Sequence, residues 1–440
     1  MTTEAFRASF TGTTLVDGDE GFSSYPFAVG APSIVVRPTT TGGVAAALEH
    51  ASESGLAVTV RSGGHSAGSY TSVAGGLVID LVAFNDIRVD GTTVTIGAGA
   101  TWGAVAAELG QHQLALTSGD TKSVGVGGLT LGGGVGWLVR SYGLALDSLR
   151  SARLVTAAGE LVTASADENA DLFWAIRGGG GNFGVAIDFT FEAHPLDGVV
   201  HGTITVDTDD LAAFLRGYRD VMRSAAEELN VTFMQFPPMG PEMPGGPALH
   251  VVWGGSDLDE AMPHIQPLID LPGVVSHDIS AKAYADSLED PHPPEPGAPM
   301  STMVGNNGWM RDFSDEAIAA VVAMDESLAG SVLMVRYVRG AFNRVPEDAT
   351  AFAWRDAEAL VISIAFLPPD TAPEVVDGVN AAWQSVASFT EGTYGNFLTD
   401  ASEKTVGLMY PAATRARLAA VKREWDPSNV FSQNQNIAPL

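Results

Sequence analysis

The sequence predicts an α+β fold in two parts, and three observations lead to that prediction. The first part, residues 1–195, consists of short apolar strand patterns separated by clusters of glycine. After residue 195 the glycine clusters disappear, and longer helical and extended patterns follow one another as far as about residue 392. Such patterns are typical of an antiparallel sheet with helices on one face.

Composition indicates a globular chain and excludes several kinds of site. Of the 440 residues, 45% are hydrophobic and 17% are charged, which is enough apolar material for a large core. Asp and Glu number 52 against 23 Lys and Arg, and a formal charge of −29 repels nucleic acid and anionic membranes. The chain has no cysteine, so disulfides, thiolate metal sites and a cysteine nucleophile are excluded. We expect no metal site and no nucleic-acid partner.

The sequence also carries no targeting or membrane signal. Residues 1–20 lack a basic segment followed by an apolar run, and no stretch approaches the ~18 apolar residues of a membrane span. We therefore expect a cytoplasmic protein with no membrane partner, and the oligomeric state stays open.

The first part begins with an expected β-α-β unit. Residues 33–38 and 56–60 have strand patterns, and residues 42–54 place apolar side chains at helical spacing. The second strand runs into Arg-Ser-Gly-Gly-His-Ser at residues 61–66. Because glycine has no Cβ, its backbone N–H groups can approach a bound anion closely, which would place His65 beside a phosphate-sized pocket. The alternative is a glycine-rich turn with a solvated histidine.

Hairpins and short helices follow this unit. Residues 86–100 and 153–164 read as hairpins that turn at Asp-Gly and Ala-Gly, and residues 102–113 read as a helix. Ser165 and Glu168 have the spacing of a capping box that would open the next helix.

Two further glycine clusters need separate interpretations. Residues 119–137 hold more glycine than a helix or strand tolerates, so we predict an extended, irregular backbone held by tertiary contacts or a ligand. A disordered linker is the alternative, but the interleaved Val, Leu and Trp side chains argue against it. Gly179, Gly181 and Gly184 match G-x-G-x-x-G. We reject a Rossmann unit, because this cluster follows a helix and opens a strand.

The second part alternates between longer elements. Residues 286–299, rich in proline and acidic residues, read as a loop. A last helix is expected at residues 411–425, with Pro411 at its first position and Asp-Pro after it. The expected helices are 210–228, 257–269, 315–328 and 374–389, and the expected strands are 231–236, 248–253, 332–338 and 360–367.

Taken together, the motifs resemble those of the berberine-bridge-enzyme-like flavoproteins, which belong to the vanillyl-alcohol-oxidase class with a PCMH-type FAD-binding domain. The resemblance covers roughly the first 195 and the last 50 residues, and the middle matches only at Arg355 and residues 394–397. The motifs that carry it lie at residues 61–66, 124–128, 132–137, 171–175, 177–185, 426–431 and 434–437.

The resemblance implies a two-part FAD-binding domain, residues 1–195 and 393–440, with a substrate-binding domain at 196–392 between them. The residues it assigns to FAD are Arg61, Ser62, Gly63, Gly64, His65, Ser66, Gly119, Val124, Gly125, Gly128, Gly132, Gly133, Gly134, Trp137, Gly181, Asn182, Gly184, Val185, Asn434 and Asn436.

It also implies how the flavin is attached. His65 matches the histidine that bonds covalently to the flavin 8α-methyl group. Many relatives add a second bond from a cysteine, but Thr121 stands at that position here, so the attachment would be single. Val124 matches the position that controls oxygen access and looks like that of an oxidase. Trp354 stands where the family often has histidine.

Tyr394 resembles the tyrosine that serves as catalytic base in the family. A free tyrosine has a pKa near ~10, so it needs a nearby cation or a partner for its proton, and Arg355 is a possible partner. A core aromatic without chemistry is the alternative for Tyr394. Weaker candidates for the base are Tyr142, Tyr410 and Tyr70.

The resemblance predicts an FAD-dependent oxidase of a small organic molecule, such as an alcohol, sugar, amine or natural-product intermediate, that reduces O2 to hydrogen peroxide. The alternatives are a dehydrogenase or oxidative cyclase with another acceptor, and a drug-sequestering protein that keeps the fold for binding. We expect the substrate between the flavin and the sheet of the second part, because pockets favour domain junctions.

Overall fold

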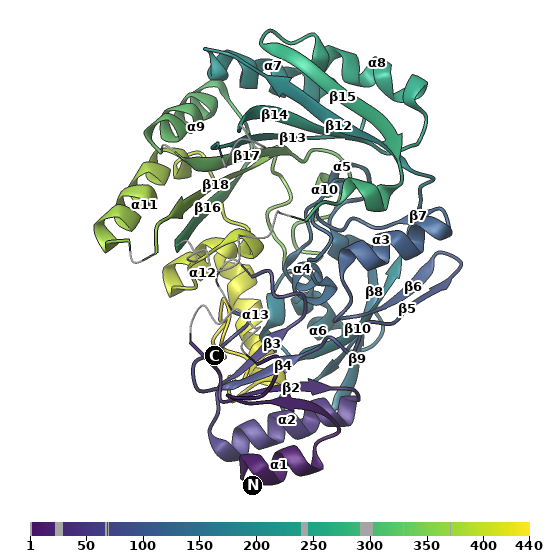
Figure 1. Ribbon diagram of the computed structural model, residues 1–440, viewed down its shortest axis with the longest axis vertical. Coiled ribbons are helices and arrows are strands. Elements are labelled where there is room, and N and C mark those ends of the chain that lie inside the picture. Colours follow the sequence, from purple (N-terminus) through teal and green to yellow (C-terminus); the bar gives the residue numbers. More distant parts are fainter. Residues whose placement is uncertain are drawn as a thin grey trace.

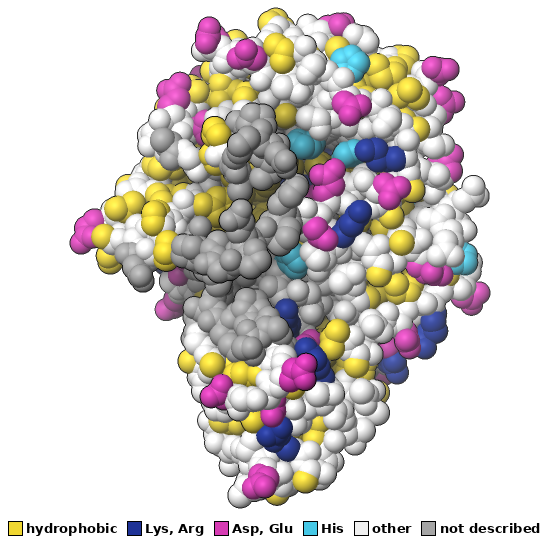
Figure 2. Space-filling model, viewed as in Figure 1, with side chains coloured by type: hydrophobic (Ala, Val, Ile, Leu, Met, Phe, Trp, Pro, Cys, Tyr) yellow, Lys and Arg dark blue, Asp and Glu magenta, His cyan; other side chains and the backbone are white. Residues whose placement is uncertain are grey.

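The computed structural model confirms an α+β architecture in two parts. It describes residues 2–22, 30–66, 68, 70–238, 245–290, 302–328, 330–369 and 371–440. The lower part in Figure 1 holds both chain ends and two sheets, and the upper part holds one larger sheet with helices on its outer face. No helix among these residues is long and apolar enough to cross a membrane. Acidic side chains are scattered over both parts of the face in Figure 2.

A four-stranded sheet forms the base of the lower part. Its order, β1-β2-β4-β3, differs from the simple expected β-α-β unit, because β4 lies between β2 and β3 and runs parallel to both. All of β4 is buried, as expected for the central strand of a parallel set. The strands are β1 Gly12–Leu15, β2 Ile34–Pro38, β3 Val58–Arg61 and β4 Leu77–Asp80, and the helices are α1 Thr3–Ser9 and α2 Thr41–Ser54.

An antiparallel five-stranded sheet, in the order β5-β6-β10-β8-β9, completes the lower part. Both expected hairpins are present. The first turns at Gly91 and Thr92 rather than at Asp90 and Gly91, because Asp90 pairs with Thr93. The strands are β5 Ile87–Asp90, β6 Thr93–Gly97, β8 Leu149–Val155, β9 Leu161–Ser165 and β10 Val185–Glu192, and the short strands β7 Leu114–Ala115 and β11 His194–Pro195 pair separately.

Two local predictions were wrong. Ser165 does not cap a helix: its Oγ accepts the N–H groups of Asp167 and Glu168 in a turn, and α6 begins only after Asn169. The glycine cluster at 119–137 is not irregular throughout, since α4 lies within it. Tertiary contacts override glycine's low helix propensity there. The helices of this region are α3 Trp102–Gln111, α4 Val126–Gly132, α5 Val139–Tyr142 and α6 Ala170–Ile176, with single 3-10 turns η1 Ala145–Ser148 and η2 Gly180–Asn182.

The upper part is an antiparallel seven-stranded sheet in the order β15-β12-β14-β13-β17-β18-β16. Strands β12, β15 and β16 were not predicted; β16 contains Asn and Gly, which strands disfavour, and is held by its full-length pairing with β18. The strands are β12 Val199–Val206, β13 Leu229–Phe236, β14 Gly246–Trp253, β15 Val274–Lys282, β16 Thr302–Met310, β17 Ser331–Tyr337 and β18 Ala359–Leu367.

Helices cover the outer face of this sheet, as expected, and its inner face meets the lower part (Figure 1). Pro411 caps α13 instead of forming its first residue. Residues 291–299 of the expected loop lie outside the described residues, and the turn η3 Tyr284–Ser287 overlaps its start. The covering helices are α7 Leu211–Ser224, α8 Leu258–Ile269, α9 Asp315–Ser327 and α11 Pro373–Ala387. The remaining helices, α10 Ala341–Arg344, α12 Glu403–Met409 and α13 Ala412–Trp425, and the turn η4 Gly395–Phe397 lie elsewhere.

One carboxyl group under these helices makes stability depend on pH. Burial raises the pKa of Asp325, in α9, to about 6, although Gln235 donates a hydrogen bond of 2.6 Å to it. Because the folded state holds this proton more tightly than the unfolded chain, stability falls as pH rises from about 4 to about 6.

We therefore expect Asp325→Asn, which keeps the acceptor for Gln235, to stabilise the protein at pH 8 by on the order of 1–2 kcal/mol and to have a much smaller effect at pH 4, where the carboxyl group is still largely protonated in both states. Thermal denaturation at both pH values measures this difference. The exposed Asp377→Asn in α11 is the matched control, and an equal effect of Asp325→Asn at both pH values would contradict the assignment.

Candidate active site

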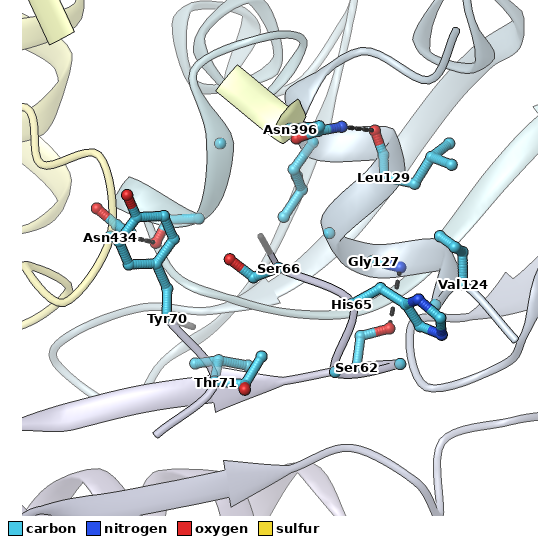
Figure 3. Close-up of a pocket in the computed structure, with 18 of the residues that line it drawn as sticks. Ser62, His65, Ser66, Tyr70, Thr71, Val124, Gly127, Leu129, Asn396 and Asn434 are labelled. Atoms are coloured by element: carbon cyan, nitrogen blue, oxygen red, sulfur yellow. Dashed lines mark hydrogen bonds between the residues drawn. The ribbon is translucent and has the colours of Figure 1, made fainter. Parts of the chain in front are cut away.

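A cavity of about 380 Å³ opens where the end of β3, the start of α4, the turn η2 and the chain's last residues meet. Figure 3 shows His65 and Val124 at one end of it and Tyr70 and Asn434 at the other. The sequence-predicted residues that line it are Ser62, Gly63, Gly64, His65, Ser66, Gly119, Val124, Gly125, Gly128, Gly181, Gly184, Asn434 and Tyr394.

The glycines of the first motif are required by close backbone contact. A Cβ on Gly63 would lie 2.2 Å from the N of Gly125, and a Cβ on Gly125 would lie 2.1 Å from the N of Gly63. Ser62 ties the same two loops together, since its Oγ donates to the carbonyl of Ala98 at 2.6 Å and accepts the N–H of Gly127 at 3.3 Å. Two distant glycine motifs therefore form one wall of the cavity.

His65 is presented to the cavity by this wall. Its side chain is exposed at the cavity lining, and the surrounding protein lowers its pKa by desolvation; Arg61 acts in the same direction and Asp290 in the opposite one. An imidazole with a lowered pKa is neutral at neutral pH, which is the nucleophilic form.

Tyr394 also lines the cavity, at the junction of the two parts. It is 2% exposed, and its hydroxyl accepts hydrogen bonds from the N–H of Gly134 at 2.9 Å and from the Nδ2 of Asn396 at 2.8 Å. Nδ2 of Asn396 also donates to the carbonyl of Leu129, which fixes the amide orientation. Burial raises the pKa of Tyr394, while these donors and the charge of Arg336 lower it.

The main chain of Tyr394 is clamped by the large sheet. Oδ1 of Asn307, in β16, accepts the N–H of Tyr394 at 2.6 Å, and its Nδ2 donates to the carbonyl of Tyr394 at 3.1 Å. The hydroxyl of Thr393 also donates to Asn307. The upper part thus fixes a side chain whose hydroxyl is held by the lower part.

Arg355 is not the partner of Tyr394, which corrects the expectation from sequence. Its guanidinium donates to both oxygens of Asp147 at 2.9 and 2.7 Å and lies against the rings of Phe342 and Phe352. Being 1% exposed, it is a buried structural ion pair. The cation whose charge acts on Tyr394 is Arg336.

The alternative tyrosines occupy other places. Tyr142 donates to the carbonyl of Pro195 and stacks on His194. Tyr410 is buried and donates to the carbonyl of Gly178. Tyr70 does line the cavity, and desolvation raises its pKa to about 12.

Some residues assigned to FAD from the sequence support the lining instead of forming it. Gly132 and Gly133 leave room for Asn396 and Tyr394, and Gly134 supplies the N–H to the phenol. The remaining ones are Arg61, whose guanidinium lies against Gly64; Trp137, at the junction; Asn182, bonded to the carbonyl of Gln435; Val185, buried in β10; and Asn436.

Sequence reasoning missed several lining residues. Asn396 lies within the motif at residues 394–397, but its hydrogen bond to the Tyr394 hydroxyl is apparent only in the fold. The others carry no local signal and reach the cavity only through tertiary structure; they include Thr59, Thr71, Asp120, Gln433 and Gln435.

The cavity has the features that FAD binding requires. The hydroxyl of Tyr70 and Oδ1 of Asn434 are buried polar atoms of the lining with no hydrogen-bond partner among the described residues, so they fit a polar occupant. The glycine loops expose backbone N–H groups where a Cβ would fill the space, as a diphosphate needs.

Comparison with known proteins agrees with this geometry. An FAD binding domain family matches residues 32–165, and the "Berberine and berberine like" family matches residues 394–438. The chain is 31% identical to (R)-6-hydroxynicotine oxidase of Paenarthrobacter nicotinovorans over 433 residues, which cover 93% of this chain and 91% of that protein.

Solved structures give the same result. The crystal structure of 6-hydroxy-D-nicotine oxidase from Arthrobacter nicotinovorans superposes with a TM-score of 0.86 at 27% identity, covering 98% of this chain and 99% of the other. Glucooligosaccharide oxidase from Acremonium strictum, which carries a 6-S-cysteinyl, 8α-N1-histidyl FAD, superposes with a TM-score of 0.82 at 25% identity, covering 98% and 97%. The protein described here therefore belongs to the berberine-bridge-enzyme-like family of FAD-linked oxidoreductases.

Proposed function

We propose that the protein is an FAD-dependent oxidase that removes a hydride from a small organic substrate and transfers the electrons to O2. The observation that carries this proposal is Tyr394, which lines the cavity and whose hydroxyl accepts two hydrogen bonds from the protein. Residues 1–195 and 393–440 would form the FAD-binding domain, and residues 196–392 the substrate-binding domain.

Each side chain has a distinct task in this proposal. The loops at Ser62–Ser66 and Gly125–Gly128 would hold the diphosphate through backbone N–H groups. Bound FAD would supply the hydride acceptor and the route by which the electron pair reaches O2, which with two protons gives hydrogen peroxide. Tyr394 would take the proton from the substrate's OH or NH group as the C–H bond breaks.

The environment of Tyr394 suits a base. The N–H of Gly134 and the Nδ2 of Asn396 can only donate, so both stabilise the phenolate more than the phenol. Their effect opposes burial, which favours the neutral form. The backbone of Val135 lowers the pKa of Tyr394 in the same way.

The attachment of the flavin is also part of the proposal. His65 would form the single covalent bond to the 8α-methyl group, as its neutral imidazole and its position on the lining allow. Glucooligosaccharide oxidase carries both a histidyl and a cysteinyl bond. Thr121 lines the cavity here and offers no thiol for the second bond.

We expect acid precipitation to leave yellow flavin on the wild-type polypeptide and to release all of it from His65→Ala. Thr121→Ala is the matched control and should keep the flavin attached. Absorbance of the washed pellet and mass spectrometry of flavin-containing peptides measure the result. A colourless wild-type pellet, or a flavinylated peptide without His65, would exclude this attachment.

Two other functions are separated from this one by peroxide release. Val124, at the oxygen-access position, favours an oxidase over a dehydrogenase or oxidative cyclase that uses another acceptor. A drug-sequestering protein would bind ligand without turnover. Anaerobic mixing with a panel of alcohols, sugars, amines and N-heterocycles shows flavin bleaching only for a substrate, and air then gives stoichiometric hydrogen peroxide only for an oxidase.

A further inference from the structure

A row of polar side chains crosses the inner face of the large sheet. Thr203 pairs with His250, His250 with Thr232, and Thr232 with Arg336, on four neighbouring strands. Directly paired residues of an antiparallel sheet point to the same face. That face meets the lower part, because the Trp137 ring lies against both His250 and Arg336.

Arg336 has more donors than the described protein satisfies. The residue is 2% exposed, and its Nη2 donates to Asp120 of the lower part. Among the described residues, neither its Nε nor its Nη1 has a hydrogen-bond partner. Nδ1 of the buried His201, two residues before Thr203 on the same strand, also has no partner among these residues. A guanidinium stays charged, and leaving its buried donors unpaired costs free energy, so a bound group that accepts them is favoured.

Arg336 is linked to the cavity through two of its lining residues. Asp120, the partner of Arg336, lines the same cavity as Tyr394, and the charge of Arg336 acts on the Tyr394 phenol. The guanidinium carbon lies 5.5 Å from the centre of the Trp137 ring. Met234 and Met334 pair on the next row of the same face and supply an adaptable apolar wall.

The charges around Arg336 decide which acceptor fits. Asp120 already neutralises the guanidinium, Glu289 adds negative charge near His250, and Lys282 adds positive charge near His201. Burial lowers the pKa of His201 to about 4 and also lowers that of His250, so both rings are uncharged at neutral pH. The cluster offers hydrogen-bond donors without net positive charge, which favours a neutral acceptor over an anion.

We propose that Arg336 anchors an uncharged oxygen acceptor of the substrate, such as a ketone, amide or lactam carbonyl, with the flat apolar part of the molecule between Trp137 and the two methionines. The natural substrates would then be neutral, planar carbonyl-bearing compounds rather than carboxylates or phosphates. This inference rests on the proposed function, because it takes the space beside Tyr394 as the substrate site.

The experiment compares three probes of similar shape: acetophenone, benzoate and ethylbenzene. Their binding to the flavin-loaded protein and to its variants is measured by titration calorimetry, which needs no turnover. Because a hydrogen bond to a charged donor contributes about 1.5–3 kcal/mol, we expect acetophenone to bind roughly ten- to hundredfold more tightly than ethylbenzene in the wild type. This ratio should fall to near one in Arg336→Met.

Arg336→Gln serves as a second variant, since it keeps a donor for Asp120 if Arg336→Met fails to fold. Arg311→Met, at an exposed arginine after β16, is the control and should leave the ratio unchanged. An unchanged ratio in both Arg336 variants, or no binding of acetophenone, would overturn the proposal. Benzoate binding more tightly than acetophenone would overturn the assignment to neutral molecules.

Failure of the underlying function has a separate signature. Flavin content, and reoxidation by air after photoreduction, are recorded for every variant. Normal values with an unchanged probe ratio would contradict the role of Arg336 alone. Loss of flavin or of reoxidation already in the wild type would contradict the proposed oxidase.

Discussion

Tyr394→Phe should lower the rate of flavin reduction by about 10²–10⁴-fold, the usual contribution of a general base, while FAD stays bound. Phenylalanine keeps the ring contacts with Trp309, Phe352 and Phe397 but removes the oxygen that accepts from Gly134 and Asn396. Stopped-flow absorbance under anaerobic conditions measures the rate. In the wild type the rate should rise with pH as Tyr394 loses its proton, and this rise should be absent from the pH profile of the variant.

Two comparisons give this result its meaning. Tyr142→Phe removes a hydroxyl that bonds only to the carbonyl of Pro195 among the described residues, and it should leave the rate unchanged. Asn307→Asp keeps the acceptor for the Tyr394 N–H but loses the donor to its carbonyl, so it should lower the rate less than Tyr394→Phe. An unaltered rate in Tyr394→Phe with full FAD would transfer the role to another group, with Tyr70 next in position.

Lys422→Met should destabilise the fold by about 3–5 kcal/mol, because it leaves a buried carboxylate without its cation. The Lys422 ammonium donates to Asp426 and Asn182 at 2.7 Å and to Phe431 at 3.0 Å, and both charged groups are fully buried. Asp426 in turn accepts the N–H groups of Val430 and Phe431. This network fixes the segment that continues into the cavity lining, so FAD affinity should fall together with stability.

Denaturant unfolding and FAD titration of the apoprotein measure the two effects. The exposed Lys404→Met is the control for charge removal at the surface. Lys422→Met combined with Asp426→Asn should recover part of the loss, since no unpaired charge then remains buried. If Lys422→Met lowered the free energy of unfolding by less than 1 kcal/mol, the buried Lys422–Asp426 pair would contribute as little to stability as an exposed pair does.

The sequence predicted best where chemistry and backbone constraint coincide. The family resemblance assigned Gly63 and Gly125 to the FAD site, and the structure places the two glycines in a contact that leaves no room for a Cβ. The α4 helix was missed for a related reason: glycine-rich sequences disfavour helices locally, and only the packing around residues 126–132 selects one. Strand β16 likewise depends on its neighbour β18 and not on its own residues.

Contacts between distant residues could not be predicted. Arg336 and Asp120 are separated by 216 positions, and neither has a sequence neighbour that indicates the other. Arg355 gives a second example. The sequence suggested it as a partner of Tyr394, but the structure pairs it with Asp147 in the core. Periodicity reports which face a side chain occupies, but the partner across a junction is set by tertiary structure.

The cavity lining combines residues 58–66 with residues 433–435, almost the whole length of the described chain apart. During synthesis, residues 58–66 leave the ribosome long before residues 433–435. A nascent chain that lacks residues 433–435 has only part of the lining. The complete lining can consequently form only after residue 435 has been synthesised.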